Sequence, residues 1–125
     1  MHRTQVQLRP EDYAPGGGLH QIALARIFSA ARVSFLTEQL LTDVGETQFV
    51  LAHFDMELSC EPLPAGSLVV ETSLEKLGGS SLTLRQALGS YRARAVMVHI
   101  KAGKPQRLPE SLRRAGELAA HELLD

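Results

Sequence analysis

The run from Gln21 to Leu41 limits the possible folds of this chain more than any other segment. It contains no proline or glycine, and its apolar residues lie on most sides of a helical projection, which is typical of a buried helix. These apolar residues are Ile22, Ala25, Ile27, Phe28, Ala31, Val33, Phe35, Leu36, Leu40 and Leu41. The less buried stripe is predicted at Arg26, Ser29, Arg32, Thr37 and Glu38. A helix of this length spans about 30 Å, so one wide sheet can wrap around it.

Beyond a predicted turn at residues 42–47, the hydrophobic period changes to two, which is the period of strands. Four strands are predicted at Gln48–Cys60, Leu68–Leu77, Ser81–Leu88 and Arg92–Lys101, and a short edge strand at Gln5–Arg9. Turns are predicted at Pro62–Gly66, Gly78–Gly79 and Ala102–Pro105, and Pro109 precedes an amphipathic helix at Glu110–Leu124. The predicted fold class is therefore α+β: an antiparallel sheet, with its last four strands in a meander, curled around a long central helix.

The composition narrows the class of protein. A length of 125 residues suits one domain, 1–125, and a net charge of −1 gives no reason to expect nucleic acid or a membrane surface as a partner. The N-terminus has no apolar core for a signal peptide, and no apolar run approaches the roughly 18 residues of a membrane span, so a cytoplasmic location is predicted. Without tryptophan, the core must rest on aliphatic residues, and association would help to bury more apolar area.

The loop between the first strand and the long helix is the candidate site. It holds Asp12, then Pro15, the three glycines Gly16, Gly17 and Gly18, and then His20. Glycines let backbone amides approach a ligand closely, and the start of a helix offers unpaired N–H groups to a negative charge. The loop is therefore predicted to bind a ligand.

Two side chains of this loop could carry chemistry. The Asp12 carboxylate could attack a carbonyl or activate water, and the neutral His20 imidazole could act as a base or donate to a substrate. The glycine amides could form an oxyanion hole. The alternatives are structural: an acid that caps a turn, a histidine bonded to local backbone and a loop chosen for its geometry.

A second polar set follows one face of the strand at Gln48–Cys60. His53, Asp55, Glu57 and Ser59 alternate with Phe54, Met56, Leu58 and Cys60. Ligands about 7 Å apart along one strand are too far apart for one ion without help from another strand, so no metal is expected. Cys60, which alternates with apolar residues, is interpreted as a buried structural thiol.

Five short motifs occur in a fixed order along nearly the whole chain. They are Asp12-Tyr13-Ala14-Pro15-Gly16-Gly17, Ala31-Arg32, Pro62-Leu63-Pro64-Ala65-Gly66-Ser67, Leu77-Gly78-Gly79-Ser80-Ser81, and Gly103-Lys104-Pro105 with Leu108-Pro109-Glu110. In this order and at this spacing they resemble hot-dog fold acyl thioesterases of the 4-hydroxybenzoyl-CoA thioesterase type.

The resemblance implies a thioester hydrolase that acts on an acyl-CoA or an acyl carrier protein. It implies a homodimer or homotetramer whose sheets join edge to edge, with the substrate tunnel at the subunit interface, and no cofactor beyond the coenzyme A or carrier protein of the substrate. The residues it assigns to substrate binding are Tyr13, Gly16, Gly17, Gly18, Leu19, Ser80 and Ser81. Lys101, Lys104 and Arg107 form a basic group that could meet the phosphates of coenzyme A; the alternative is a solvated turn.

The sequence departs from the family at one position. In the family the second Asp of the Asp-x-Asp motif carries the chemistry, and Ala14 occupies that place here. Either Asp12 or His20 is then the catalytic residue, or the usual mechanism is absent. Two further functions stay open: an acyl-thioester dehydratase or hydratase, and a non-catalytic module that binds an acyl thioester.

Overall fold

The computed structural model describes residues 2–15, 19–40, 48–59 and 66–124. The elements are β1 (His2–Leu8), η1 (Pro10–Asp12), α1 (Gln21–Phe35), η2 (Leu36–Leu40), β2 (Gln48–Glu57), β3 (Gly66–Leu77), β4 (Ser81–Leu88), β5 (Tyr91–Lys101), β6 (Lys104–Pro105) and α2 (Glu110–Leu124). The predictions for Gly16–Gly18, the turn at 42–47, Cys60 and most of the turn at Pro62–Gly66 fall outside the described residues.

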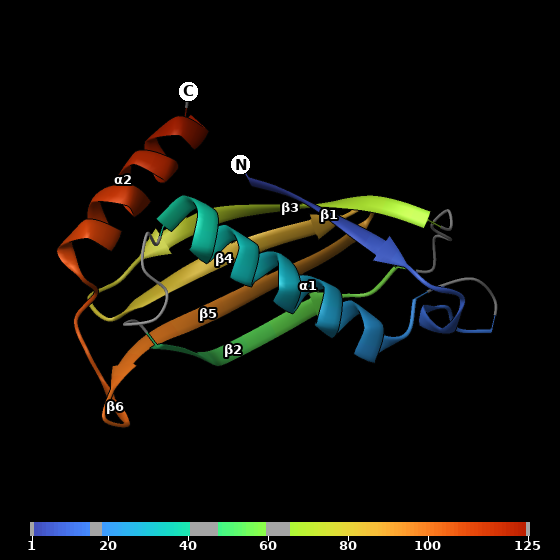
Figure 1. The fold of residues 1–125 in the computed structure, drawn as a ribbon, viewed down its shortest axis with the longest axis horizontal. Coiled ribbons are helices and arrows are strands. Elements are labelled where there is room, and N and C mark those ends of the chain that lie inside the picture. Colours follow the sequence, from blue (N-terminus) through green and yellow to red (C-terminus); the bar gives the residue numbers. More distant parts are fainter. Residues whose placement is uncertain (1, 16–18, 41–47, 60–65, 125) are drawn as a thin grey trace.

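One antiparallel sheet curls around the long helix, as predicted (Figure 1). Helix α1 lies along the sheet and continues into the π-helical turn η2, so the helical segment matches the predicted run to within one residue. The C-terminal helix α2 covers one end of the sheet, where it packs mainly on β3.

The predicted meander is wrong for one strand. The strand order is β1-β3-β4-β5-β2, so only β3, β4 and β5 follow one another. Strand β2 pairs with β5, from Gln48 opposite Ile100 to Glu57 opposite Arg92. The edge of β3 is occupied by β1, which leaves β5 as the open neighbour for β2. Strand β1 is an edge strand, as predicted, and β2 forms the other edge.

The core lies between one side of α1 and the inner face of the sheet. Leu24, Ile27 and Phe28 pack in one cluster with sheet residues that include Tyr91. A second cluster surrounds Phe35 at the other end of the helix.

The outer side of α1 is open, which corrects the expectation that the helix is buried all round. Ile22 is 85% exposed and Val33 is 58% exposed, because within one chain the sheet covers only one side of the helix. Arg32, which was expected in the less buried stripe, is buried against the sheet instead.

Arg32 belongs to a buried polar cluster beneath the sheet. Its Nη1 donates to Oε1 of Gln86 at 3.0 Å, and its guanidinium lies 4.8 Å from the centre of the Phe54 ring. Gln86 Nε2 donates to the carbonyl of Phe28 and to the hydroxyl of Thr72. Burial lowers the pKa of Arg32, and no described carboxylate pairs with it. Gln86 therefore joins the buried cation, the helix and the sheet.

Two strands depart from strict alternation. The pairing of β3 with β4 shifts between Leu74 and Lys76, and Lys76 is exposed while Thr72 and Leu74 are buried. On β2 the predicted alternation is correct from His53 to Glu57, but the strand ends at Glu57. No helix in the described part of the chain is long and apolar enough to cross a membrane.

Candidate functional site

A hollow of about 820 Å³ lies at the start of α1. Figure 1 shows that this helix begins at the end of the sheet where η1 leads toward it. The residues that line it come from the η1 region, the first turns of α1, the segment after β2 and the start of β5. They are Glu11, Asp12, Ala14, Leu19, His20, Gln21, Ile22, Ala23, Arg26, Leu58, Ser59 and Tyr91. Apolar side chains and a few ionisable groups therefore meet in one place.

Backbone contacts hold the two ends of the glycine loop together. The His20 N–H donates to the carbonyl of Asp12 at 2.9 Å, and Tyr13 forms an isolated bridge with Leu19. The Leu19 N–H donates to the hydroxyl of Tyr91 at 3.3 Å. These contacts tie the loop to β5 and place His20 at the edge of the hollow.

Asp12 is an ion-paired carboxylate. Its Oδ2 accepts the N–H of Arg9 at 2.9 Å, and both of its oxygens lie 3.0 Å from Nη2 of Arg26. The pKa of Asp12 is lowered. The hydrogen bond from the Arg9 N–H is the largest cause, and the Arg26 guanidinium lowers the pKa further, while burial acts in the opposite direction. Both oxygens of Asp12 are therefore engaged, and the contact anchors η1 to α1.

The start of α1 is open to the hollow. His20 is the N-cap residue, its side chain is exposed, and it makes no capping hydrogen bond to the helix. The first turn also contains no acidic residue. The first N–H groups of a helix have no partner within the helix, and Gln21, Ile22 and Ala23 all line the hollow. His20 and the first residues of α1 thus line the same space.

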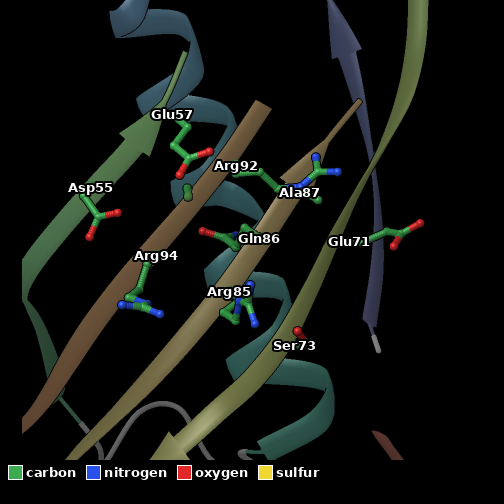
Figure 2. A pocket seen from close by; sticks show the side chains of 10 residues that line it. Asp55, Glu57, Glu71, Ser73, Arg85, Gln86, Ala87, Arg92 and Arg94 are labelled. Carbon is green, nitrogen blue, oxygen red and sulfur yellow. The ribbon is translucent and has the colours of Figure 1, made fainter. Parts of the chain in front are cut away.

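A second hollow, of about 420 Å³, lies on the outer face of the sheet (Figure 2). Three carboxylates line it, Asp55, Glu57 and Glu71, and three arginines balance them, Arg85, Arg92 and Arg94. The apolar side chains in its lining are those of two alanines, Ala87 and Ala93.

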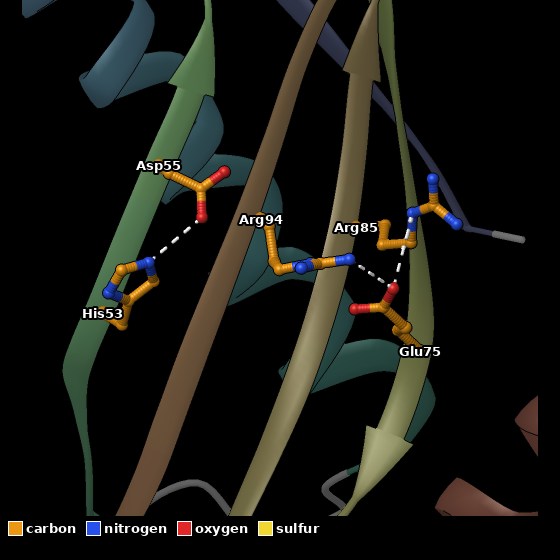
Figure 3. A network of polar contacts seen from close by, with 5 residues as sticks. All are labelled: His53, Asp55, Glu75, Arg85 and Arg94. Atoms are coloured by element: carbon orange, nitrogen blue, oxygen red, sulfur yellow. Dashed lines mark hydrogen bonds and ion pairs between the residues drawn. The ribbon is translucent and has the colours of Figure 1, made fainter.

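Three of these charged groups, Asp55, Arg85 and Arg94, form ion pairs with residues beside the hollow (Figure 3). Oε1 of Glu75 lies 2.8 Å from Nη2 of Arg94 and 3.8 Å from Nε of Arg85. His53 Nε2 lies 3.1 Å from Oδ2 of Asp55. Among the described residues, no three His, Cys, Asp or Glu side chains gather as a metal site would require. This face has the properties of a solvated surface.

The structure brings some of the predicted site residues together and separates others. Asp12, Leu19 and His20 line the hollow at the start of α1, while Tyr13 packs beside it against the core. Ser80 and Ser81 lie in and after the β3–β4 hairpin, at the far end of β3 from η1. Because β3 has 12 residues, these serines are roughly 36 Å from the η1 end of the strand. Within one chain they do not reach the hollow.

Several residues that line the hollow could not be assigned to it from the sequence alone. Arg26 was predicted only as part of a polar stripe, and its contact with Asp12 depends on how η1 folds back on the helix. Tyr91 and Leu58 reach the hollow only because β5 and β2 end beside it.

Comparison with solved structures finds close likenesses of fold. A thioesterase from Thermus thermophilus in complex with coenzyme A and zinc is 23% identical, with 95% of this chain and 94% of that chain covered and a TM-score of 0.81. A probable thioesterase from Bartonella henselae is 24% identical, with 86% of this chain and 98% of that chain covered and a TM-score of 0.72. A 1,4-dihydroxy-2-naphthoyl-CoA thioesterase from Synechocystis is 19% identical, with 91% of this chain and 93% of that chain covered and a TM-score of 0.74.

No family model and no curated protein matches the sequence. The likeness is therefore one of architecture: a curled antiparallel sheet around one long helix, shared with proteins of the thioesterase superfamily over nearly their whole length. The chain has the hot-dog fold.

Proposed function

We propose that this protein hydrolyses an acyl thioester of coenzyme A or of an acyl carrier protein in the hollow at the start of α1. The observation that carries the proposal is the meeting of three features there: an uncapped helix start, the exposed imidazole of His20, and apolar side chains. A thioesterase of the same fold has been solved with coenzyme A, which agrees with this substrate class.

The reaction needs a stabilised oxyanion, a directed water and a route for one proton. The thioester carbonyl oxygen points at the N–H groups of the first helical turn, where the helix dipole favours negative charge. His20 takes a proton from water as the water attacks the carbonyl carbon. The tetrahedral intermediate collapses by breaking the C–S bond, and the imidazolium returns the proton to the leaving thiolate, which yields a carboxylic acid and a free thiol.

Asp12 is assigned a positioning role. Both of its oxygens are engaged by Arg9 and Arg26, so it is poorly placed to attack a carbonyl. The ion pair instead fixes η1 against α1 and thereby holds His20, whose N–H is bonded to the Asp12 carbonyl. Ala14, at the position of the family's usual catalytic Asp, contributes only a methyl group to the lining.

The acyl chain lies on Leu19, Ile22, Ala23 and Leu58. In one chain this surface is open, since Ile22 is 85% exposed and Leu58 is 55% exposed. A second subunit would cover it.

The β2 edge is the surface that suits such a partner. Its outer backbone groups have no neighbouring strand in the described chain, and Val50 and Leu51 are 43% and 46% exposed. An unprotected edge strand is a template for pairing with another strand. We therefore propose a homodimer in which two β2 strands pair antiparallel.

A thiol-release assay on a panel of acyl-CoA and acyl carrier protein substrates tests the function. The His20→Ala variant is expected to lose more than tenfold in kcat, about 1.4 kcal/mol of barrier, with little change in folding. Arg85→Ala is the control, because Arg85 is an exposed side chain on the central strand β4, away from the hollow and from the β2 edge, and it is expected to retain full activity.

The other outcomes distinguish the alternatives. A change in enoyl absorbance without thiol release would indicate a hydratase or dehydratase. Saturable binding without turnover would indicate a binding module. A protein that neither binds nor cleaves any thioester would contradict the proposed site altogether.

A further inference from the structure

The hydroxyl of Tyr91 is a buried polar group of the hollow that the reaction proposed above leaves unused. Tyr91 is 1% exposed and packs in the apolar cluster with Leu24 and Phe28. Its oxygen accepts the N–H of Leu19, and within the described part of the chain no group accepts its own proton. A buried tyrosine hydroxyl usually has a partner for its proton, because an unmade hydrogen bond is costly there. The contact with Leu19 therefore accounts for only the accepting half of this hydroxyl.

The position of this hydroxyl suits a ligand at the start of α1. Leu19 comes directly before His20, the N-cap residue, and Tyr91 lines the same hollow as the first residues of the helix. The N–H groups of the first turn of a helix point out of it, toward the residues that precede it. A carbonyl oxygen that binds them therefore lies near Leu19, whose nitrogen is 3.3 Å from the phenolic oxygen.

We propose that Tyr91 donates a hydrogen bond to the carbonyl oxygen of the bound thioester, beside the N–H groups of the first turn of α1, and is a second catalytic residue. The inference rests on the proposed function and adds a side-chain donor to its oxyanion site. The Leu19 N–H fixes the phenolic oxygen in place, and a hydroxyl that accepts one hydrogen bond becomes a stronger donor of another.

Tyr91 keeps its proton throughout the reaction. As water attacks the carbonyl carbon, the electron pair of the C=O double bond moves onto the oxygen, where the hydrogen bonds from Tyr91 and the helix stabilise the negative charge. The pair returns to re-form the C=O bond when the C–S bond breaks, and His20 carries the proton from water to the leaving thiolate.

The first test measures thiol release by Tyr91→Phe, which keeps the aromatic ring and removes only the hydroxyl. We expect kcat to fall roughly a hundredfold with little change in KM, as for the loss of one oxyanion donor. Ser90→Ala is the matched control. It removes a hydroxyl from the preceding residue, which bonds to Ser59 and is not among the described residues that line the hollow, and it should keep the wild-type kcat. An unchanged kcat in Tyr91→Phe would overturn the proposal.

The second test separates contact with the substrate from the anchoring of Leu19. It compares two non-hydrolysable pantetheine analogues: a ketone, in which CH₂ replaces the thioester sulfur, and a compound in which CH₂ also replaces the carbonyl. Tyr91→Phe is expected to bind the ketone several times more weakly and the carbonyl-free compound equally well. The infrared band of the bound, ¹³C-labelled carbonyl should move to higher frequency, because the carbonyl has lost a donor. An unchanged band, or an equal loss of affinity for both compounds, would show that Tyr91 acts only through the loop and would contradict the proposal.

The wild-type protein offers a measurement that needs no variant. The chain has two tyrosines, Tyr13 and Tyr91, so ¹³C labelling of the phenolic carbon gives two NMR resonances. One of them is expected to shift further with the ketone than with the carbonyl-free compound, because only the ketone accepts the phenolic proton. Equal shifts with both compounds would overturn the proposal. Failure of the proposed function is a different result, in which the wild-type protein releases thiol from no thioester.

Discussion

Replacing Gln86 with leucine should destabilise the protein through the buried cation that Gln86 holds. Gln86 accepts from Arg32 and donates to the Phe28 carbonyl and the Thr72 hydroxyl, and all of these contacts lie beneath the sheet. Leucine has a similar volume and no polar atoms. The Gln86→Leu variant therefore leaves Nη1 of Arg32 and the Thr72 hydroxyl without their partner, with little change in packing.

The magnitude follows from these contacts. Loss of a hydrogen bond to a buried charged group costs about 2 kcal/mol, and a neutral buried bond costs about 1 kcal/mol. We expect the free energy of unfolding to fall by about 3 kcal/mol. For a domain of this size this lowers Tm by roughly 10 °C.

A double-mutant cycle separates the cost of leaving the Arg32 charge without its partner from other effects of the Gln86 substitution on stability. In Arg32→Met/Gln86→Leu the buried cation is gone, and replacing a buried polar pair by apolar residues of similar volume is often neutral. The double variant is expected to be more stable than Gln86→Leu, with a coupling energy of about 2 kcal/mol measured by urea denaturation. A double variant that loses the sum of the two single effects would refute the role assigned to Arg32.

Three further predictions concern the loop anchor and the C-terminal helix. Because the pKa of Asp12 is lowered in the folded state, its ion pair stabilises the protein above about pH 4 and this contribution is lost as the pH falls below that. The difference in unfolding free energy between wild type and Asp12→Asn should therefore shrink in urea melts repeated below pH 4. A difference that does not change with pH would contradict the stabilising role of the Asp12 ion pair. Arg26→Gln should lower kcat, because it releases η1 and His20, while Arg26→Lys restores part of it; equal activity of the two variants would contradict a positioning role. Gly116→Val should lower Tm by several degrees, since a Cβ at Gly116 would lie 3.0 Å from Leu77 Cδ1; an unchanged Tm would show that α2 can move away from β3 at no cost.

The local pattern of the sequence predicts most elements and misses what depends on distant contacts. The period of α1 and of the strands was read correctly because each period is a property of neighbouring residues. Strand β2 pairs with β5 because β1 occupies the edge of β3. The spacing of residues within β2 cannot predict this pairing. The burial of Arg32 likewise depends on Gln86, which lies 54 residues away in the chain.

The candidate site likewise contains residues predicted from local sequence and residues that depend on distant contacts. Asp12, Leu19 and His20 were predicted from one short loop and do lie together at the start of α1. Arg26 and Tyr91 complete the hollow through contacts formed only when the chain folds. Ser80 and Ser81 follow from the family resemblance, and their distance from the hollow within one chain means that only a second subunit could bring such positions near it.

The structure of this protein with a non-hydrolysable acyl-CoA analogue bound is the most direct test of the central claim. We expect the atom in place of the thioester carbonyl oxygen to lie about 3 Å from backbone nitrogens of the first turn of α1, with His20 on the side from which water attacks. An analogue bound with its acyl group away from Leu19 and Ile22, for example over the charged outer face of the sheet, would contradict it.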